Sequence, residues 1–118
     1  MEINGLKMLS KKNRIKDKRL IKKILKKGRR VKFGYLLFKY LPSEEENSKF
    51  AFIVSKKVSK KAVVRNKIKR QLSEILRTNL ANFPIKVNGV FIALPGIGEL
   101  DFAQKKENLF QVLKAIKK

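Results

Sequence analysis

The segment AVVRNKIKRQLSEIL, residues 62–76, carries apolar side chains at helical spacing and a dense run of cations between them. The apolar residues recur every three or four positions, which predicts a helix over about residues 60–79 with one buried stripe. The stripe consists of Val64, Ile68, Leu72 and Ile75. The opposite face consists of Asn66, Arg70, Ser73 and Arg77. Because only one face is apolar, this helix must pack against a sheet or against other helices in a layered domain.

Acidic residues that would neutralise these cations are missing at helical spacing. No Glu or Asp lies three or four positions before Arg65, Lys69 or Arg70, so the usual i,i+4 pairs do not form there. The whole chain repeats the imbalance, with 31 Lys and Arg against 9 Asp and Glu and a net charge of +22 in 118 residues. Self-repulsion of this size opposes compaction. The partner that most commonly relieves it is nucleic acid, whose phosphates release counterions on binding, and an anionic membrane surface is the other candidate.

The remaining periodicities predict one α+β domain, a small central sheet packed by helices in the order α-β-β-α-β-α. The predicted elements are a helix at 17–27, strands at 35–41, 49–57 and 87–94, and a last helix at 101–117, with a possible short extra strand at 31–33. Apolar residues make up 43% of the chain, which is enough for a folded core despite the charge.

The ends of the predicted domain carry their own signals. Asp17 suits the N-cap of the first helix, and Gly28 suits its C′ position. The domain is expected to span residues 17–118, preceded by a mobile basic arm over residues 1–16. The cations assigned to this arm are Lys11, Lys12, Arg14 and Lys16.

Alternation along the first two strands separates two faces of the predicted sheet. The bulkier face, expected to meet the main core, consists of Leu36, Phe38, Tyr40, Phe50, Phe52 and Val54. The smaller and more polar face, expected to line an open groove, consists of Tyr35, Leu37, Lys39, Ala51, Ile53 and Ser55. In the last helix the expected buried stripe consists of Phe102, Leu109, Leu113 and Ile116.

The chain offers little for an active site of its own. It has no Cys and no His, which excludes disulfides, thiolate or imidazole metal ligands and His-based acid–base catalysis. The carboxylates of residues 44–46 share a polar turn without other ligands, while Glu99 and Asp101 suit the start of the last helix. We therefore expect no catalytic residue, cofactor or metal site in the protein itself. The apolar runs are too short to span a membrane and no signal peptide is visible, so a cytoplasmic protein is expected.

Two motifs resemble one known family. The segment SKKVSKKAVVRNKIKRQLSEIL, residues 55–76, resembles the signature of the protein subunit of bacterial ribonuclease P, in which a strand ends in Ser-Lys-Lys and a basic loop leads to a helix with Arg-Asn-x-x-Lys-Arg. The segment KKNRIKDKRLIKKILKKG, residues 11–28, resembles the first helix of that family. The resemblance covers nearly the whole chain in element order and length.

The resemblance implies a protein component of a ribonucleoprotein endoribonuclease, which removes the 5′ leader from precursor tRNA. The active site and its Mg²⁺ ions would lie in the catalytic RNA, and the protein would be a monomer in a one-to-one complex with that RNA. The residues that match the RNA-binding positions are Arg65, Asn66, Lys67, Lys69 and Arg70, with Lys56, Lys57, Lys60 and Lys61 in the preceding loop. The positions implied for a cleft that binds the single-stranded leader are Ile21, Leu25, Tyr35, Leu37, Lys39, Ile53 and Ser55. The resemblance also implies a left-handed β-α-β crossover, against the general right-handed rule.

The sequence departs from the family pattern at several positions. Lys67 stands where Arg is frequent, which keeps the charge but loses the bidentate fork. Ile21 and Leu25 stand where the first helix often carries Phe, and Lys39 replaces a common aromatic. Ser59 stands in the basic loop where Gly is frequent. Stacking on leader bases is therefore expected to contribute less in this chain, and charge to contribute more.

Two alternatives stay open at this point. A ribosomal or ribosome-assembly protein that binds structured rRNA would share the basic composition. A membrane-surface protein would use the amphipathic helix at 17–27, although that helix is short and its apolar face has no aromatic residue.

Overall fold

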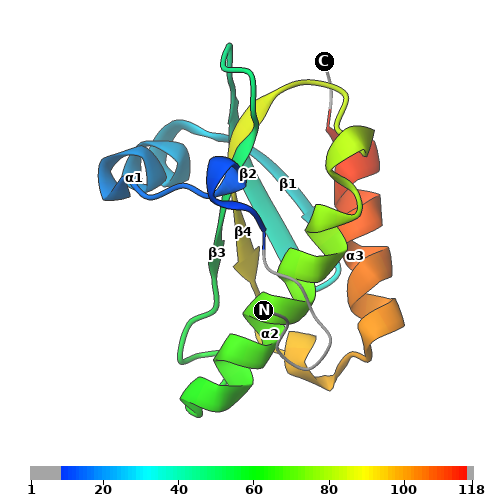
Figure 1. Cartoon of the computed structure of the whole chain (residues 1–118). Coiled ribbons are helices and arrows are strands. Elements are labelled where there is room, and N and C mark those ends of the chain that lie inside the picture. Colours follow the sequence, from blue (N-terminus) through cyan, green and yellow to red (C-terminus); the bar gives the residue numbers. More distant parts are fainter. Residues whose placement is uncertain (1–8, 117–118) are drawn as a thin grey trace.

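The centre of the molecule is a mixed sheet whose strand order, β1-β2-β4-β3, differs from the order along the chain. Figure 1 shows this computed structural model, which describes residues 9–116. The strands are β1 (Arg29–Phe33), β2 (Leu36–Pro42), β3 (Lys49–Ile53) and β4 (Val87–Ala93), and the helices are α1 (Lys18–Lys27), α2 (Ala62–Arg77) and α3 (Phe102–Ala115). Three short 3-10 turns, η1 (Lys11–Asn13), η2 (Leu80–Asn82) and η3 (Ile97–Glu99), complete the elements.

The sheet combines antiparallel and parallel pairs. β1 and β2 form an antiparallel hairpin, and β4 lies antiparallel to β2 and parallel to β3. The hairpin turns at Gly34, whose φ of 57° suits glycine. The predicted α+β order is thus confirmed, and the possible extra strand is present as β1, longer than residues 31–33. The chain crosses from β3 to β4 through α2, and the left-handed path of this crossover stays a prediction.

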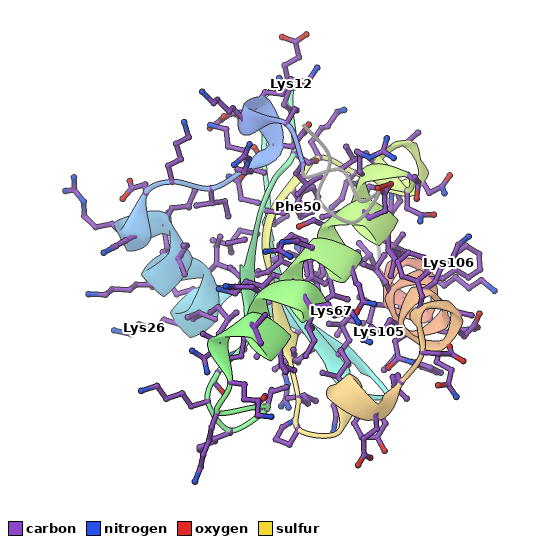
Figure 2. The ribbon with its side chains drawn as sticks, turned by 60° about the horizontal axis from the view of Figure 1, so that its bottom comes forward. Lys12, Lys26, Phe50, Lys67, Lys105 and Lys106 are labelled. Atoms are coloured by element: carbon purple, nitrogen blue, oxygen red, sulfur yellow. The ribbon has the colours of Figure 1, made fainter. Side chains whose placement is uncertain are left out.

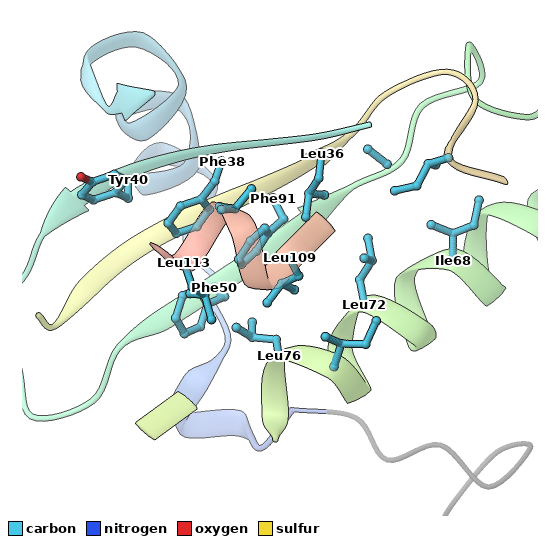
Figure 3. Close-up of a cluster of buried hydrophobic side chains, with 14 of the residues drawn as sticks. Leu36, Phe38, Tyr40, Phe50, Ile68, Leu72, Leu76, Phe91, Leu109 and Leu113 are labelled. Atoms are coloured by element: carbon cyan, nitrogen blue, oxygen red, sulfur yellow. The ribbon is translucent and has the colours of Figure 1, made fainter. Parts of the chain in front are cut away.

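The bulky face of the sheet packs against α2 and α3 (Figure 3). The Phe38 and Phe91 rings stack with centroids 4.2 Å apart, and the Phe50 ring lies 6.0 Å from that of Phe91. All three phenylalanines are almost completely buried. The helices contribute Ile68, Leu72, Ile75 and Leu76 from α2 and Leu109, Val112 and Leu113 from α3. The predicted assignment of the bulky face to the main core is therefore confirmed.

The other face of the sheet packs against α1, which Figure 1 shows on the opposite side from α2 and α3. Ile24 of α1 is fully buried and clusters with Val90 of β4 and Ile15. α1 begins as predicted, with the Asp17 side chain accepting a hydrogen bond from the Arg19 N–H at 2.9 Å. Gly28 ends the helix with φ −66°, so it is not a left-handed C′ residue. Glycine is required there because a Cβ would lie 2.4 Å from the Ile24 carbonyl oxygen.

The start of the described chain is packed rather than loose, unlike the arm expected from its composition. Leu9 is 2% exposed and joins the main core, and the Ile15 N–H donates to the Phe50 carbonyl oxygen at 2.9 Å. Asn13 is also buried and donates through Nδ2 to the Ser48 carbonyl oxygen at 2.8 Å. Residues 9–16 thus form part of the domain, and residues 1–8 of the predicted arm lie outside the described residues.

Two helix side chains differ from the prediction in their exposure to solvent. Ser73, expected on the polar face of α2, is 2% exposed and lines one hollow together with Leu9 and Phe50. Phe102, expected in the buried stripe of the last helix, is 38% exposed because it is the first residue of α3, beyond the sheet. Asp101 caps α3 as predicted, accepting from the Gln104 N–H at 2.8 Å.

Candidate nucleic-acid interface

Arg65 organises the loop that leads into α2. Its Nη1 donates hydrogen bonds to the carbonyl oxygens of Ser59 and Lys60, at 2.9 and 3.0 Å. Within the loop, the Ser55 Oγ accepts from the Lys57 N–H at 3.3 Å, and the Ser59 Oγ accepts from the Lys61 N–H at 3.2 Å. The loop is therefore two tight turns held to the helix by the first cation of the motif.

The first turn of α2 presents positive potential that nothing in its own sequence offsets. Lys61 occupies the N-cap without a side-chain hydrogen bond, and the first turn has no acidic residue. The preceding loop places four exposed ammonium groups around this helix end, those of Lys56, Lys57, Lys60 and Lys61. The N-terminus of a helix carries partial positive charge and unpaired N–H groups, and both favour phosphate.

The motif residues themselves point to solvent or to the margin of the core. Asn66 and Lys67 are exposed, and Arg65, Lys69 and Arg70 are half-buried. Three ion pairs join residues within the range 9–116, namely Arg19–Asp17, Lys49–Glu45 and Arg77–Glu74. None of these pairs within residues 9–116 includes a motif residue. With respect to that part of the chain, the motif cations are open to contact with an external anion.

The four cations assigned to the basic arm gather at one hollow beside β3. This hollow is lined by Lys11, Lys12, Arg14, Lys16 and Lys49, together with Ile15, Asp17 and Leu20. Figure 2 labels Lys12, which belongs to η1. η1 and the pairing of Arg14 with Phe50 hold the backbone of this segment on the sheet, so its exposed cations stay near the β3 edge.

A second hollow continues from the first along the outer edge of β3 toward α2. Arg14 and Ile15 line both hollows, and the second is completed by Leu9, Phe50, Ala51, Phe52, Lys69 and Ser73. Its floor is mostly apolar, and Arg14 and Lys69 supply a cation from each side. Two regions that are 55 positions apart in the sequence thus form one surface, an apolar strip between positive groups that suits an unpaired nucleic-acid strand.

Most of the predicted leader-binding residues lie on the sheet face beneath α1, and Ser55 and Tyr35 lie in turns. Ile21, Leu25 and Ile53 meet in the cluster beneath α1, and the Lys39 Nζ donates to the Leu25 carbonyl oxygen at 2.8 Å. Leu37 is buried in β2, opposite Ile92 of β4. Ser55 is exposed in the turn after β3.

Tyr35 lies apart from the other predicted leader-binding residues. It lies in the β1–β2 turn, where its N–H donates to the Asn108 Oδ1 at 2.8 Å. Its ring lies so close to Gly96 that a Cβ there would come within 2.6 Å of it. The prediction that placed it in a strand beside Leu37 is wrong, because the hairpin turns at Gly34 and Tyr35 and β2 begins only at Leu36.

Sequence reasoning missed the apolar part of the hollow at the β3 edge. Leu9 and Ile15 lie there, although both belong to a basic segment without a helical or strand period. For Ile15, its isolation between Arg14 and Lys16 was the one available sign of burial. The described residues include no group of acidic side chains arranged to hold a metal ion.

The fold and these surfaces define a basic nucleic-acid-binding domain, with cations on α2, on the loop before it and at the neighbouring sheet edge, as well as on α1 and β1. Residues 9–117 match the family model described as Ribonuclease P. The chain is 35% identical over 107 residues to the ribonuclease P protein component of Syntrophomonas wolfei, covering 91% of this chain and 89% of that protein. It is 36% identical over 112 residues to the corresponding protein of Petrotoga mobilis, covering 92% of each.

Solved structures show the same fold. The RNase P protein from Thermotoga maritima superposes with a TM-score of 0.80 at 28% identity, over 89% of this chain and 98% of that one. The Staphylococcus aureus RNase P protein superposes with a TM-score of 0.78 at 28% identity, over 86% and 93%. The chain therefore belongs to the ribonuclease P protein family, the protein component of a ribonucleoprotein endoribonuclease of tRNA processing. The ribosomal alternative has no support in these comparisons.

Proposed function

We propose that this protein binds the catalytic RNA of ribonuclease P in a one-to-one complex and holds the single-stranded 5′ leader of precursor tRNA. The start of α2 and the loop at 55–61 would meet the catalytic RNA. The hollow at the β3 edge and the adjoining sheet face beside α1 would take the leader. The reaction and its Mg²⁺ ions would belong to the RNA, and the complex would work in the cytoplasm.

The observation that carries this proposal is the set of motif cations, which form no ion pair with any residue of 9–116, beside a strip that carries Arg14 and Lys69. Catalytic RNA and precursor tRNA are both polyanions, so their approach is opposed by charge repulsion that depends on ionic strength. A protein with a net charge of +22 lowers that repulsion. A strip that also contacts an unpaired strand would favour precursor over mature tRNA, because only the precursor carries a leader.

The test is reconstitution with the catalytic RNA at low Mg²⁺ concentration, following removal of the leader from precursor tRNA. We expect the protein to accelerate cleavage and to increase the affinity for precursor more than for mature tRNA. A basic protein of similar charge and unrelated fold controls for general screening of repulsion. Equal stimulation by that control, or none by this protein, would contradict the proposal.

In the folded protein, the apolar side of α1 is not available to a membrane surface. The apolar side of α1 faces the sheet, with Ile24 fully buried and Leu20, Ile21 and Leu25 half-buried against it. None of the helices in residues 9–116 has the length and apolarity needed to cross a bilayer. A helix that uses its apolar side in the core has little left to insert into a lipid surface.

A further inference from the structure

A pocket between α2 and the start of α3 shares only Lys67 with the surfaces described above. Two lysines face each other across it, Lys67 from α2 and Lys105 from α3, and Gln71 lies one turn further along α2. The rest of the lining is Val64, Ile68, Gly98, Leu100 and Asp101. Figure 2 shows Lys67 and Lys105 next to each other at this junction, with Lys106 on the outer side of α3.

Lys105 is an unusual lysine because it is 4% exposed. Its Nζ donates to the Leu100 carbonyl oxygen at 2.7 Å. An ammonium group has three N–H donors, so this single bond does not saturate it, and no ion pair of Lys105 occurs within residues 9–116. The nearby Asp101 carboxylate accepts from the Gln104 N–H in the cap of α3. A buried charge without a bonded counter-ion costs stability.

The electrostatics of the pocket favour an added anion. Burial lowers the pKa of Lys105, the charge of Lys67 lowers it further, and Asp101 opposes both effects. These three are the titratable groups that line the pocket. An anion between the two ammonium groups would replace their mutual repulsion with two attractive contacts, and Gln71 could donate a third through its amide.

We propose that this pocket binds one phosphate group through Lys67, Gln71 and Lys105. The phosphate could come from an RNA backbone or from a small free phosphate compound. In the first case the RNA-binding surface continues from the motif around α2 to α3, and that case rests on the proposed function. In the second case the pocket works without RNA.

The first experiment titrates the free protein with inorganic pyrophosphate and follows the Cε and Nζ NMR signals of each lysine. A chain this basic binds phosphate weakly at many places, so the exposed neighbour Lys106 is the internal control. We expect the Lys105 signals to move with a saturable curve and those of Lys106 to move less and without saturation. Lys67→Gln should weaken the affinity at Lys105 roughly tenfold, the loss of one charge-assisted contact.

The second experiment separates the two sources with the catalytic RNA. If the RNA supplies the phosphate, Lys105→Met should lower the salt slope of RNA binding by about one, with a smaller change for Lys106→Met. An unchanged slope together with specific pyrophosphate binding assigns the pocket to a free phosphate compound. If Lys105→Met does not fold, the exposed-site variant Lys67→Gln and the wild-type titration still decide the pyrophosphate result.

Equal movement of Lys105 and Lys106, or an affinity that Lys67→Gln leaves unchanged, would overturn the inference. Such a result would leave the proposed function intact if the protein still stimulated leader cleavage. Conversely, saturable pyrophosphate binding in a protein that failed to stimulate cleavage would support the pocket and count against the proposed function.

Discussion

The two faces of the sheet are packed in different ways. Toward α2 and α3, large side chains interdigitate, and the rings of Phe38, Phe50 and Phe91 are almost completely buried. Toward α1, the cluster has only three buried members, Ile15, Ile24 and Val90, and their apolar neighbours keep part of their surface exposed. One face thus holds most of the buried apolar volume, and the other remains partly open beside Lys39 and the hollow at the β3 edge.

This difference indicates how a small and highly charged chain combines stability with binding. Buried apolar area supplies the main stabilisation, and most of it lies between the sheet and the two helices α2 and α3. The leader is proposed to lie on the less packed face beside α1 and at the edge of β3, where side chains have room to contact a strand. α2 contributes to both functions, because its apolar stripe closes the main core while its first turns present the motif.

The largest effect is expected from Phe91→Ala, which opens a cavity at the centre of the main core. Truncation of a buried phenylalanine costs about 3–5 kcal/mol of unfolding free energy, a large part of the total stability of a small domain. Denaturant unfolding monitored by circular dichroism measures this loss. Phe102→Ala is the matched control, because that side chain is 38% exposed and its loss should cost less than about 1 kcal/mol.

Ile24→Ala tests the other face in the same assay. The side chain is fully buried, but its neighbours are half-exposed and can move into the space, so the expected cost is near about 2 kcal/mol, the lower end for such truncations. Because α1 also lies beside the proposed leader site, this variant should weaken precursor binding more than binding of the catalytic RNA. A cost equal to that of Phe91→Ala would remove the distinction between the two faces.

The elements with a strong period are the ones that sequence reasoning placed well. α2 runs over Ala62–Arg77 within the predicted 60–79, and its stripe residues Ile68, Leu72 and Ile75 are buried. Alternation also assigned the faces of β2 and β3, because a strand with one side in a core allows a single register. The resemblance added the motif positions, which the structure places on the exposed side and the margin of α2.

The errors come from contacts between segments that are distant in the sequence. Ser73 has the polarity of an exposed residue but is buried, in a hollow that it lines with Leu9 and Phe50 from distant segments. A helical projection of α2 alone does not include those segments. The packing of Ile15 on Phe50 depends likewise on the position of β3 at the sheet edge. Tyr35 was misplaced because the hairpin turn includes it and β2 begins one residue later, at Leu36, while the faces of the residues that follow are as expected.

The motif on α2 should affect RNA binding more than folding. Changing Arg65→Ala and Arg70→Ala together should lower the salt slope of binding to the catalytic RNA by about one to two, with a loss of affinity at physiological salt. Filter binding across a salt series measures both. Arg77→Ala is the control on the same helix, because Arg77 pairs with Glu74 at the far end from the motif. Unchanged affinity in the double variant would contradict the assignment of the motif.

A small effect on stability is expected at Lys39, which lies on the less packed face of the sheet, beside α1. Its half-buried Nζ donates to the Leu25 carbonyl oxygen at 2.8 Å and so ties β2 to the last turn of α1. Lys39→Met keeps most of the stem and removes the charge and this hydrogen bond, at a cost of about 0.5–1.5 kcal/mol.

In the functional assay, Lys39→Met should affect leader binding and not binding of the catalytic RNA. If the leader crosses this face, Lys39→Met should reduce the gain in precursor affinity with leader length and leave binding of the catalytic RNA unchanged. Precursors that differ only in leader length, measured with the reconstituted complex, give this dependence. A parallel loss for every leader length, or a loss of catalytic-RNA binding, would mean that Lys39 serves assembly or the α1 contact alone, and the leader would then have to lie elsewhere on the protein.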